Sequence, residues 1–126
     1  MGETFEEIYK QYLWKENIAS RLPFRFNDCG RWWGNNPILQ SEQEIDLLAI
    51  NDKESKAIFC ECKWTEEQID TYVLNSLVDK STIFKYKDKY YILFSRSGFK
   101  DNVRKRINDR ILLVDFSHMN SQQIKA

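Results

Sequence analysis

The sequence has few of the side chains from which zinc centres are built. It contains one histidine, His118, and three cysteines, whereas a zinc site usually takes about four ligands. Cys60 and Cys62 form a C-x-C pair inside an apolar run, while His118 lies in a polar tail. We therefore interpret Cys29, Cys60 and Cys62 as reduced thiols that act as small apolar residues.

Long hydrophobic runs are also missing. No apolar run approaches the roughly 20 residues that cross a bilayer, and residues 1–10 lack the apolar centre of a signal peptide. We therefore expect a cytoplasmic protein. The absence of a G-x-x-x-x-G-K-[ST] loop excludes this stretch itself as a P-loop ATPase. The 126 residues are 42% hydrophobic and 14% aromatic, which predicts one domain, residues 1–126, around a single core.

The formal net charge is zero, which argues against a nonspecific nucleic-acid binder. The charges are unevenly distributed along the chain, however. Residues 1–79 contain eight basic and fifteen acidic residues, and residues 80–126 contain eleven and four. An acidic part that could hold metal therefore adjoins a basic part that could hold phosphate. Chance segregation of charge in a small domain is the alternative.

A β-hairpin is predicted in the middle of the chain. Two apolar runs, residues 45–50 and 57–62, flank a polar tip, which is the pattern of two strands joined by a short loop. If residues 52–55 form the loop, counting outwards along both strands places Asp46 opposite Glu61. Side chains alternate across a strand, so the two carboxylates would lie on one face of the sheet.

The same register places Glu44 opposite Lys63, so that carboxylates and an ammonium group meet at one place. Like charges opposite each other in a sheet repel, and a buried carboxylate loses its hydration. A divalent cation would remove this conflict, and magnesium prefers one or two carboxylates plus waters. The alternative is that Lys63 pairs with Glu44 or Glu61 on a solvated sheet face, with little energetic effect.

At these residues the chain resembles the PD-(D/E)xK nuclease superfamily of restriction endonucleases and archaeal Holliday-junction resolvases. The first acidic position of the family pattern matches Asp46, and its (D/E)xK triplet matches Glu61, Cys62 and Lys63. The spacing of 15 positions between Asp46 and Glu61 is within the usual range of that pattern. The resemblance implies a metal-dependent deoxyribonuclease.

Three sequence blocks, two of which contain these motif residues, look like the uncharacterised domain at the C-terminus of many predicted P-loop ATPases of archaea and bacteria. They are GRWWG at residues 30–34, EID at 44–46 and ECKW at 61–64. The likeness covers nearly the whole chain. It implies that the sequence is a C-terminal fragment of a longer protein with an ATPase domain on the same chain.

The resemblance also implies roles for individual residues. Asp46 and Glu61 would bind Mg²⁺ or Mn²⁺, and the backbone carbonyl of Cys62 would complete the metal site. Such an ion polarises a phosphate and lowers the pKa of bound water. Lys63 would orient or deprotonate the attacking water and stabilise developing negative charge.

Other charged residues are candidates for supporting roles. Glu44 could be a third carboxylate. Glu6, near the start of the first predicted helix, could reach the metal through water, but a first-turn glutamate also complements the helix dipole. Backbone contacts to DNA, which give affinity without sequence reading, are expected from Arg96, Lys100, Arg104 and Lys105.

Hydrophobic periodicity predicts the order helix, three strands, helix, strand, helix, strand. Thr65 and Gln68 form a capping box that places the start of the second helix at Thr65. Right-handed crossovers make the later strands parallel neighbours of the hairpin. The expected class is α/β, a mixed β-sheet flanked by helices. This matches the restriction endonuclease-like αβββαβ core of the superfamily that the chain resembles. The remaining elements are expected at residues 4–20, 21–39, 90–95, 99–108 and 111–116.

Two aromatic features remain open. In a strand, one of Trp32 and Trp33 would be core and the other half exposed, available either to stack on a base or to pack on a helix. Gln68 and Tyr72 spell Q-x-x-x-Y, which is similar to a motif beside the active site in one nuclease branch. Because Gln68 follows Lys63 so closely, we interpret this match as accidental.

The sequence thus predicts a DNA endonuclease-like domain that depends on Mg²⁺ or Mn²⁺. The competing hypothesis is a nuclease-fold module of an AAA-type ATPase that binds DNA or a protein without cleaving. A plain interaction domain, built on the exposed tryptophan and the basic helix, is a further alternative. A homodimer would suit the cutting of two strands.

Overall fold

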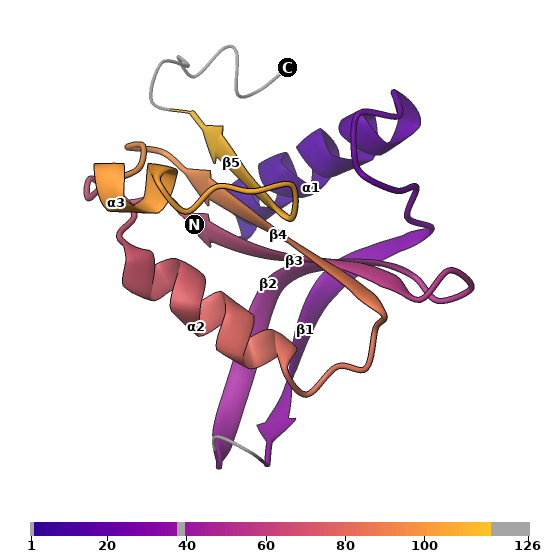
Figure 1. Ribbon diagram of the computed structural model, residues 1–126. Helices are drawn as coiled ribbons and strands as arrows, with labels where there is room; N and C mark the ends of the chain where they lie inside the picture. Colours follow the sequence, from indigo (N-terminus) through magenta and orange to yellow (C-terminus); the bar gives the residue numbers. More distant parts are fainter. Residues whose placement is uncertain (1, 38–39, 117–126) are drawn as a thin grey trace.

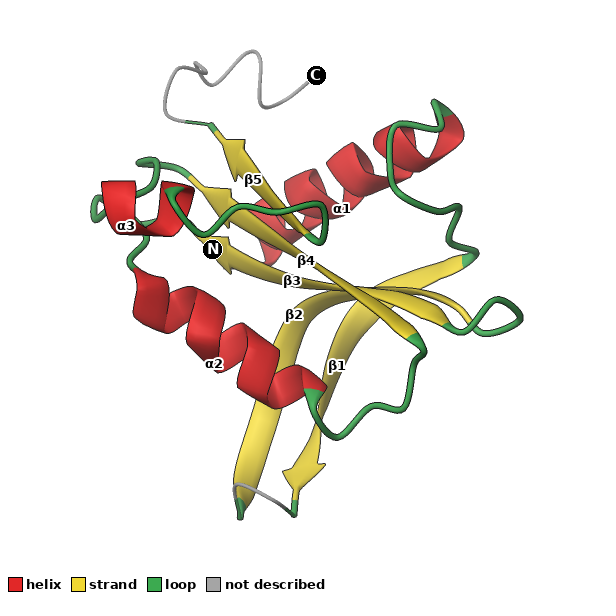
Figure 2. Ribbon diagram, viewed as in Figure 1, coloured by secondary structure: helices red, strands yellow, loops and turns green. Residues whose placement is uncertain are grey.

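The computed structural model describes residues 2–37 and 40–116, without the side chains of residues 2–6 and 36. Figure 2 shows one twisted sheet with helices on both of its faces. Within the described ranges no helix is long and apolar enough to cross a membrane. The elements are α1 Gly2–Ile18, β1 Asp28–Asn36, β2 Ser41–Asn51, β3 Lys56–Lys63, α2 Thr71–Ser81, β4 Asp88–Ser95, α3 Asp101–Arg104 and β5 Ile111–Asp115.

The sheet is mixed, as predicted. Its strands lie in the order β1-β2-β3-β4-β5. The β1–β2 and β2–β3 pairs are antiparallel, and the β3–β4 and β4–β5 pairs are parallel. The α/β class and the αβββαβ order of the first six elements are therefore confirmed.

Two apolar clusters hold the helices to opposite faces of the sheet. Ile58 and Cys60 of β3 are fully buried in one cluster with Tyr9 of α1. Phe59, between them in sequence, is buried in the other cluster with Leu77 of α2. This alternation is the one expected of a strand covered on both faces. Figure 1 shows α1 on one side of the sheet and α2 with α3 on the other.

The first helix presents a buried stripe at the spacing i, i+4, i+8. Tyr9 and Leu13 are fully buried on it, and Asn17 is 3% exposed. The Asn17 amide donates to the Phe26 carbonyl and accepts from the Phe26 N–H, both at 2.9 Å. Because a buried amide is costly unless it is hydrogen-bonded, these two bonds fix the segment that leads from α1 into β1.

The second helix begins later than predicted. The capping box placed its start at Thr65, whereas α2 begins at Thr71. Ile69 forms a parallel β-bridge with Phe99, so the stretch before the helix is held in an extended form. The true N-cap is Asp70, whose carboxylate accepts a 2.6 Å hydrogen bond from the Thr71 N–H.

The third helix is much shorter than predicted. Residues 99–108 were expected to be helical, but α3 is the single turn Asp101–Arg104. At its start, the bridge to Ile69 holds Phe99 extended. Beyond its end, the Asn108 side chain accepts a 2.7 Å hydrogen bond from the Arg110 N–H. Such local side-chain bonds compete with helix formation.

Tyr9 has an unusual environment. Its side chain is fully buried, and its hydroxyl has no hydrogen-bond partner among the described residues. Burial raises the pKa of this phenol far above its ordinary value, with smaller contributions from Cys62 and Asp46. Tyr9→Phe should therefore increase the free energy of unfolding by about 1 kcal/mol, because it removes a buried polar group that is left unpaired.

Urea denaturation monitored by circular dichroism would measure this change. Tyr12→Phe is the matched control, because the Tyr12 hydroxyl donates to Glu16 at 3.4 Å and its loss should be neutral or slightly destabilising. A clear loss of stability in Tyr9→Phe would show that the hydroxyl has a partner outside the described side chains.

Candidate functional site

A β-bulge lies in β2 next to Asp46. Gly30 pairs with Leu48, but Trp32 pairs with Ile45, so β2 contains one more residue than β1 between these two pairs. Ile45 therefore packs in the same apolar cluster as Leu48, which strict alternation would not allow. Bulges redirect side chains and are common next to active sites. Asp46 is one of the two β2 residues within this bulge.

The two predicted acidic residues converge. The hairpin register is the predicted one, with Ile50 opposite Ala57, and its continuation places Asp46 opposite Glu61. Asp46 Oδ2 accepts a 2.9 Å hydrogen bond from the Cys62 N–H. The Asp46 carboxylate also acts on that of Glu61, raising its pKa. The two predicted acidic side chains are thus neighbours at the end of the hairpin away from its turn.

Glu61 is the central residue of the group. Its side chain is only 14% exposed, with Lys63 Nζ 3.8 Å from Oε2 and Lys80 Nζ 3.6 Å from Oε1. Burial and, to a smaller extent, the Asp46 carboxylate raise the pKa of Glu61 to about 7, although the two lysines act to lower it.

Lys80 is a site residue that sequence reasoning missed. It lies in the last turn of α2, and its Nζ also donates a 2.9 Å hydrogen bond to the Glu44 carbonyl. A signal was present in the sequence: Lys80 follows the buried residues Val73 and Leu77 at i+7 and i+3. A cation on the apolar stripe of a helix needs an anionic or polar partner.

Glu44 has a different position from the one predicted. Instead of facing Lys63, its carboxylate forms an ion pair with Arg31 of β1, and the β2–β3 ladder already ends at the pair Leu47–Cys60. Only its backbone carbonyl takes part in the group, through the bond from Lys80. The side chain of Glu6 lies outside the described residues, so its predicted role stays a prediction.

One predicted DNA contact lies directly beside Lys63. The Arg96 N–H donates a 3.0 Å hydrogen bond to the Lys63 carbonyl, at the carboxyl ends of β4 and β3. The guanidinium group of Arg96 lies 5.8 Å from the centroid of the Trp64 ring, within the range of a cation–π interaction. The backbone of Arg96 is therefore next to Lys63, while its guanidinium lies over Trp64, which packs against the cluster on the α1 face.

The other predicted DNA contacts are partly neutralised. Lys100 forms an ion pair of 3.2 Å with Asp70, and Arg104 one of 3.5 Å with Asp115. The bonds from Asn102, Thr71 and Lys100 lower the pKa of Asp70 to about 2, so it stays ionised at neutral pH. Lys105 is exposed. The structure thus brings the backbone of Arg96 to Lys63 and leaves the remaining cations on the surface near α3.

The tryptophan pair is divided as predicted. Trp32 packs edge-on against Phe84, with ring centroids 4.9 Å apart. Trp33 is 70% exposed and pairs with Glu44 across the β1–β2 ladder. A large exposed aromatic side chain of β1 therefore lies opposite Glu44, which precedes Asp46 by two residues in β2.

A pocket of about 410 Å³ opens beside Lys63. It is formed mainly by the segment between β3 and α2, and Gln68 and Tyr72 both line it. The Tyr72 side chain is 67% exposed. The Q-x-x-x-Y pair, which we interpreted as accidental, therefore borders the same hollow as the lysine of the candidate site.

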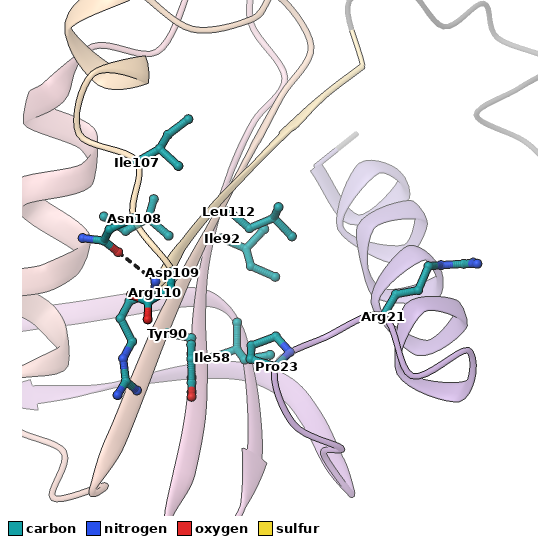
Figure 3. Close-up of a pocket in the computed structure, with 11 residues that line it drawn as sticks. Arg21, Pro23, Ile58, Tyr90, Ile92, Ile107, Asn108, Asp109, Arg110 and Leu112 are labelled. Atoms are coloured by element: carbon teal, nitrogen blue, oxygen red, sulfur yellow. Dashed lines mark hydrogen bonds between the residues drawn. The ribbon is translucent and has the colours of Figure 1, made fainter.

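A second pocket, of about 350 Å³, lies on the α1 face of the sheet. Figure 3 shows Ile58, Ile92 and Leu112 around it, with Arg110 nearby. The guanidinium of Arg110 lies 4.6 Å from the centroid of the Tyr90 ring. Its lining contains a single carboxylate, so this pocket lacks the acidic pair that distinguishes the Asp46 site.

The donor set fits magnesium or manganese better than zinc. Across the described part of the chain, no three His, Cys, Asp or Glu side chains form a metal-binding group. The oxygen donors at this site are the Asp46 and Glu61 carboxylates, with the Cys62 backbone adjacent. Mg²⁺ commonly binds to one or two carboxylates and keeps several waters. A divalent cation would also remove the repulsion that raises the pKa of Glu61.

Comparison with solved structures supports the fold alone. The chain is similar to "Protein of Unknown Function AF1548", with a TM-score of 0.50 and 18% sequence identity. The similarity covers 88% of this chain and 59% of that one.

Comparison of sequences gives a closer relationship. The chain is 32% identical over 119 residues to the uncharacterized protein MJECL04 of Methanocaldococcus jannaschii. The match covers 91% of this chain and 25% of the relative, so the chain spans about a quarter of the relative's length. Residues 1–78, which include Asp46, Glu61 and Lys63, match the family DUF234. The chain therefore belongs to the DUF234 family of archaeal and bacterial proteins of unknown function.

Proposed function

We propose that this domain is a metal-dependent endonuclease of the PD-(D/E)xK type that hydrolyses phosphodiester bonds in DNA. The observation that carries the proposal is the proximity of Asp46 and Glu61 on neighbouring strands, where Asp46 accepts a hydrogen bond from the N–H of Cys62, the residue after Glu61, with Lys63 3.8 Å from Glu61. A solvated ion pair on a sheet face would not need two neighbouring carboxylates. A hydrolytic metal site does need them.

Each residue of the group has a distinct chemical task in this proposal. Asp46 and Glu61 would hold Mg²⁺ or Mn²⁺, together with the Cys62 carbonyl. The ion would supply charge neutralisation at the phosphate and lower the pKa of a water molecule. The Lys63 side chain is 41% exposed, so its ammonium group can reach this water, orient it and stabilise the charge that develops during attack.

DNA would be held through its backbone. Arg96 lies beside Lys63 and would contact a phosphate next to the cleaved one. Lys100 and Arg104 would exchange their surface ion pairs with Asp70 and Asp115 for phosphates, a small cost because exposed pairs are weak. Lys105 would add to this contact. Such contacts give affinity and orientation rather than sequence specificity.

The partners of the proposed enzyme follow from its size and its resemblance. The chain spans a quarter of its archaeal relative, and we propose that it works as the nuclease domain of a longer cytoplasmic protein with an ATPase domain, and that it acts as a homodimer. A second candidate function is a non-cleaving module that binds DNA or protein. The exposure of Trp33 favours this alternative, because an exposed aromatic ring can stack on a base.

Incubation of the purified domain with plasmid, single-stranded and branched DNA in Mg²⁺ or Mn²⁺ tests the proposal. Asp46→Ala and Lys63→Ala should each reduce cleavage by roughly a hundredfold or more, since they remove a metal ligand and the proposed acid–base group. Lys89→Ala is the control, because Lys89 is bonded to the Ser81 carbonyl and takes no part in the site.

Cleavage that is equal in wild type and both variants would indicate a contaminating nuclease and contradict the proposal. DNA binding without metal-dependent cleavage would favour the non-cleaving module. Thermal unfolding adds a second readout: Mn²⁺ should raise the melting temperature of the wild type and of Lys89→Ala but not that of Asp46→Ala.

A further inference from the structure

Each oxygen of the Glu61 carboxylate faces a different lysine. Oε2 lies 3.8 Å from Lys63 Nζ, and Oε1 lies 3.6 Å from Lys80 Nζ. The lysines come from different elements, because Lys63 ends β3 and Lys80 lies in the last turn of α2. A cation that binds Glu61 must therefore share it with both ammonium groups or displace one of them.

The two lysines are held differently. The Lys63 side chain is 41% exposed and can swing away at little cost. The Lys80 side chain is 18% exposed, and its Nζ is anchored by the 2.9 Å hydrogen bond to the Glu44 carbonyl. Lys80 is therefore a nearly fixed positive charge next to Glu61, whereas Lys63 is the adaptable one.

The fixed charge changes the electrostatics of the metal site. With both carboxylates ionised, Asp46 and Glu61 are balanced by Lys63 and Lys80, so the group is neutral overall. A divalent cation would enter a neutral cluster rather than one with two negative charges. Since the interaction of charges a few ångströms apart is strong in a partly buried site, this balance must lower the affinity for metal.

We propose that Lys80 is a built-in cation that competes with the divalent metal for Glu61 and thereby holds down the metal affinity of the domain. The inference rests on the proposed metal site. Lys80 is then neither a ligand nor a proton donor in the reaction. It sets the metal concentration at which the domain becomes loaded.

Titration with Mn²⁺, following the free ion by electron paramagnetic resonance, tests the inference without DNA and without activity. Lys80→Gln should bind Mn²⁺ about tenfold more tightly than the wild type, since the competing charge is gone. Lys80→Arg keeps the charge and should bind like the wild type. Unfolding of each variant in EDTA checks that the fold is intact.

Lys89→Gln is the matched control for a general change in net charge. Lys89 is also half-buried and donates a 2.8 Å hydrogen bond to a backbone carbonyl, that of Ser81. Its backbone lies opposite Ala57, four positions along β3 from Glu61, which is a separation of roughly 13 Å between the backbone positions. Its replacement should leave Mn²⁺ affinity unchanged.

The outcomes separate this inference from the proposed function. If Asp46→Ala abolishes Mn²⁺ binding but Lys80→Gln binds no more tightly than the wild type, the competition is refuted and the metal site stands. Weaker binding by Lys80→Gln would likewise refute it, because Lys80 would then position Glu61 rather than compete. If Asp46→Ala binds Mn²⁺ like the wild type, there is no such metal site, and both proposals fail.

Discussion

Replacement of Glu61 by glutamine should increase the free energy of unfolding at pH 8 by about 3 kcal/mol. The folded protein raises the pKa of this carboxyl from 4.5 to about 7, and each unit corresponds to about 1.4 kcal/mol of differential interaction between its two protonation states. Glutamine has nearly the shape of the protonated acid and carries no charge. It therefore escapes the cost of ionising next to Asp46 in a buried position.

The sign of the pH dependence follows from the direction of the shift. Because the pKa is higher in the folded state, Glu61 binds its proton more tightly there than in the unfolded chain. Its contribution to stability is fully present below pH 4.5 and is lost as the pH rises through about 7. The wild type should therefore lose stability across this window, and Glu61→Gln should lose much less.

Urea denaturation at pH 4.5, 6, 7 and 8 in EDTA would measure the effect. Glu66→Gln, at an exposed position, controls for the loss of one negative charge and should follow the wild type. Parallel stability curves for the wild type and Glu61→Gln would contradict the raised pKa of Glu61, to which burial contributes most and the Asp46 carboxylate next.

Phe94→Ala should lower the free energy of unfolding by about 3–5 kcal/mol, the usual range for removing a fully buried aromatic side chain. Phe94 of β4 is 0% exposed. Its ring stacks on Tyr9 at 4.7 Å and lies 5.7 Å from Tyr12 in an edge-on contact. It also lies 6.2 Å from Phe116. The substitution would leave a cavity beneath α1 and loosen that helix from the sheet.

Phe84→Ala provides the comparison on the other face. Phe84 is only partly buried, and its ring contacts Trp32 and Phe59 with centroids 4.9 and 5.3 Å apart. Phe84→Ala should lower the free energy of unfolding by less than half as much as Phe94→Ala. Chemical denaturation of both variants measures this difference. Equal decreases would show that α1 contributes little to the stability of the sheet.

Much of the site could be predicted because it depends on local pattern. The apolar runs at residues 45–50 and 57–62, on either side of the turn, predict the register of the hairpin, and Ile50 does pair with Ala57. Period-two alternation then places Glu61 on the face with Phe59, opposite to Cys60. Once the register is known, the meeting of Asp46 with Glu61 follows from counting.

Other features depend on tertiary contacts that no local pattern encodes. The bulge in β2 is visible only in its pairing with β1, where Trp32 meets Ile45. The start of α2 is set by the bridge between Ile69 and Phe99, thirty residues apart. The inward position of Lys80, by contrast, could have been inferred from its spacing to Val73 and Leu77.

The hairpin has a consequence for recognising distant relatives. Its turn at residues 52–55 lies at the end of β2 and β3 away from the two acids. Extra residues inserted at the turn would lengthen both strands outwards and leave Asp46 beside Glu61. The number of residues between Asp46 and Glu61 can therefore vary, although the distance between their side chains cannot. A search for divergent homologues should allow that gap to vary.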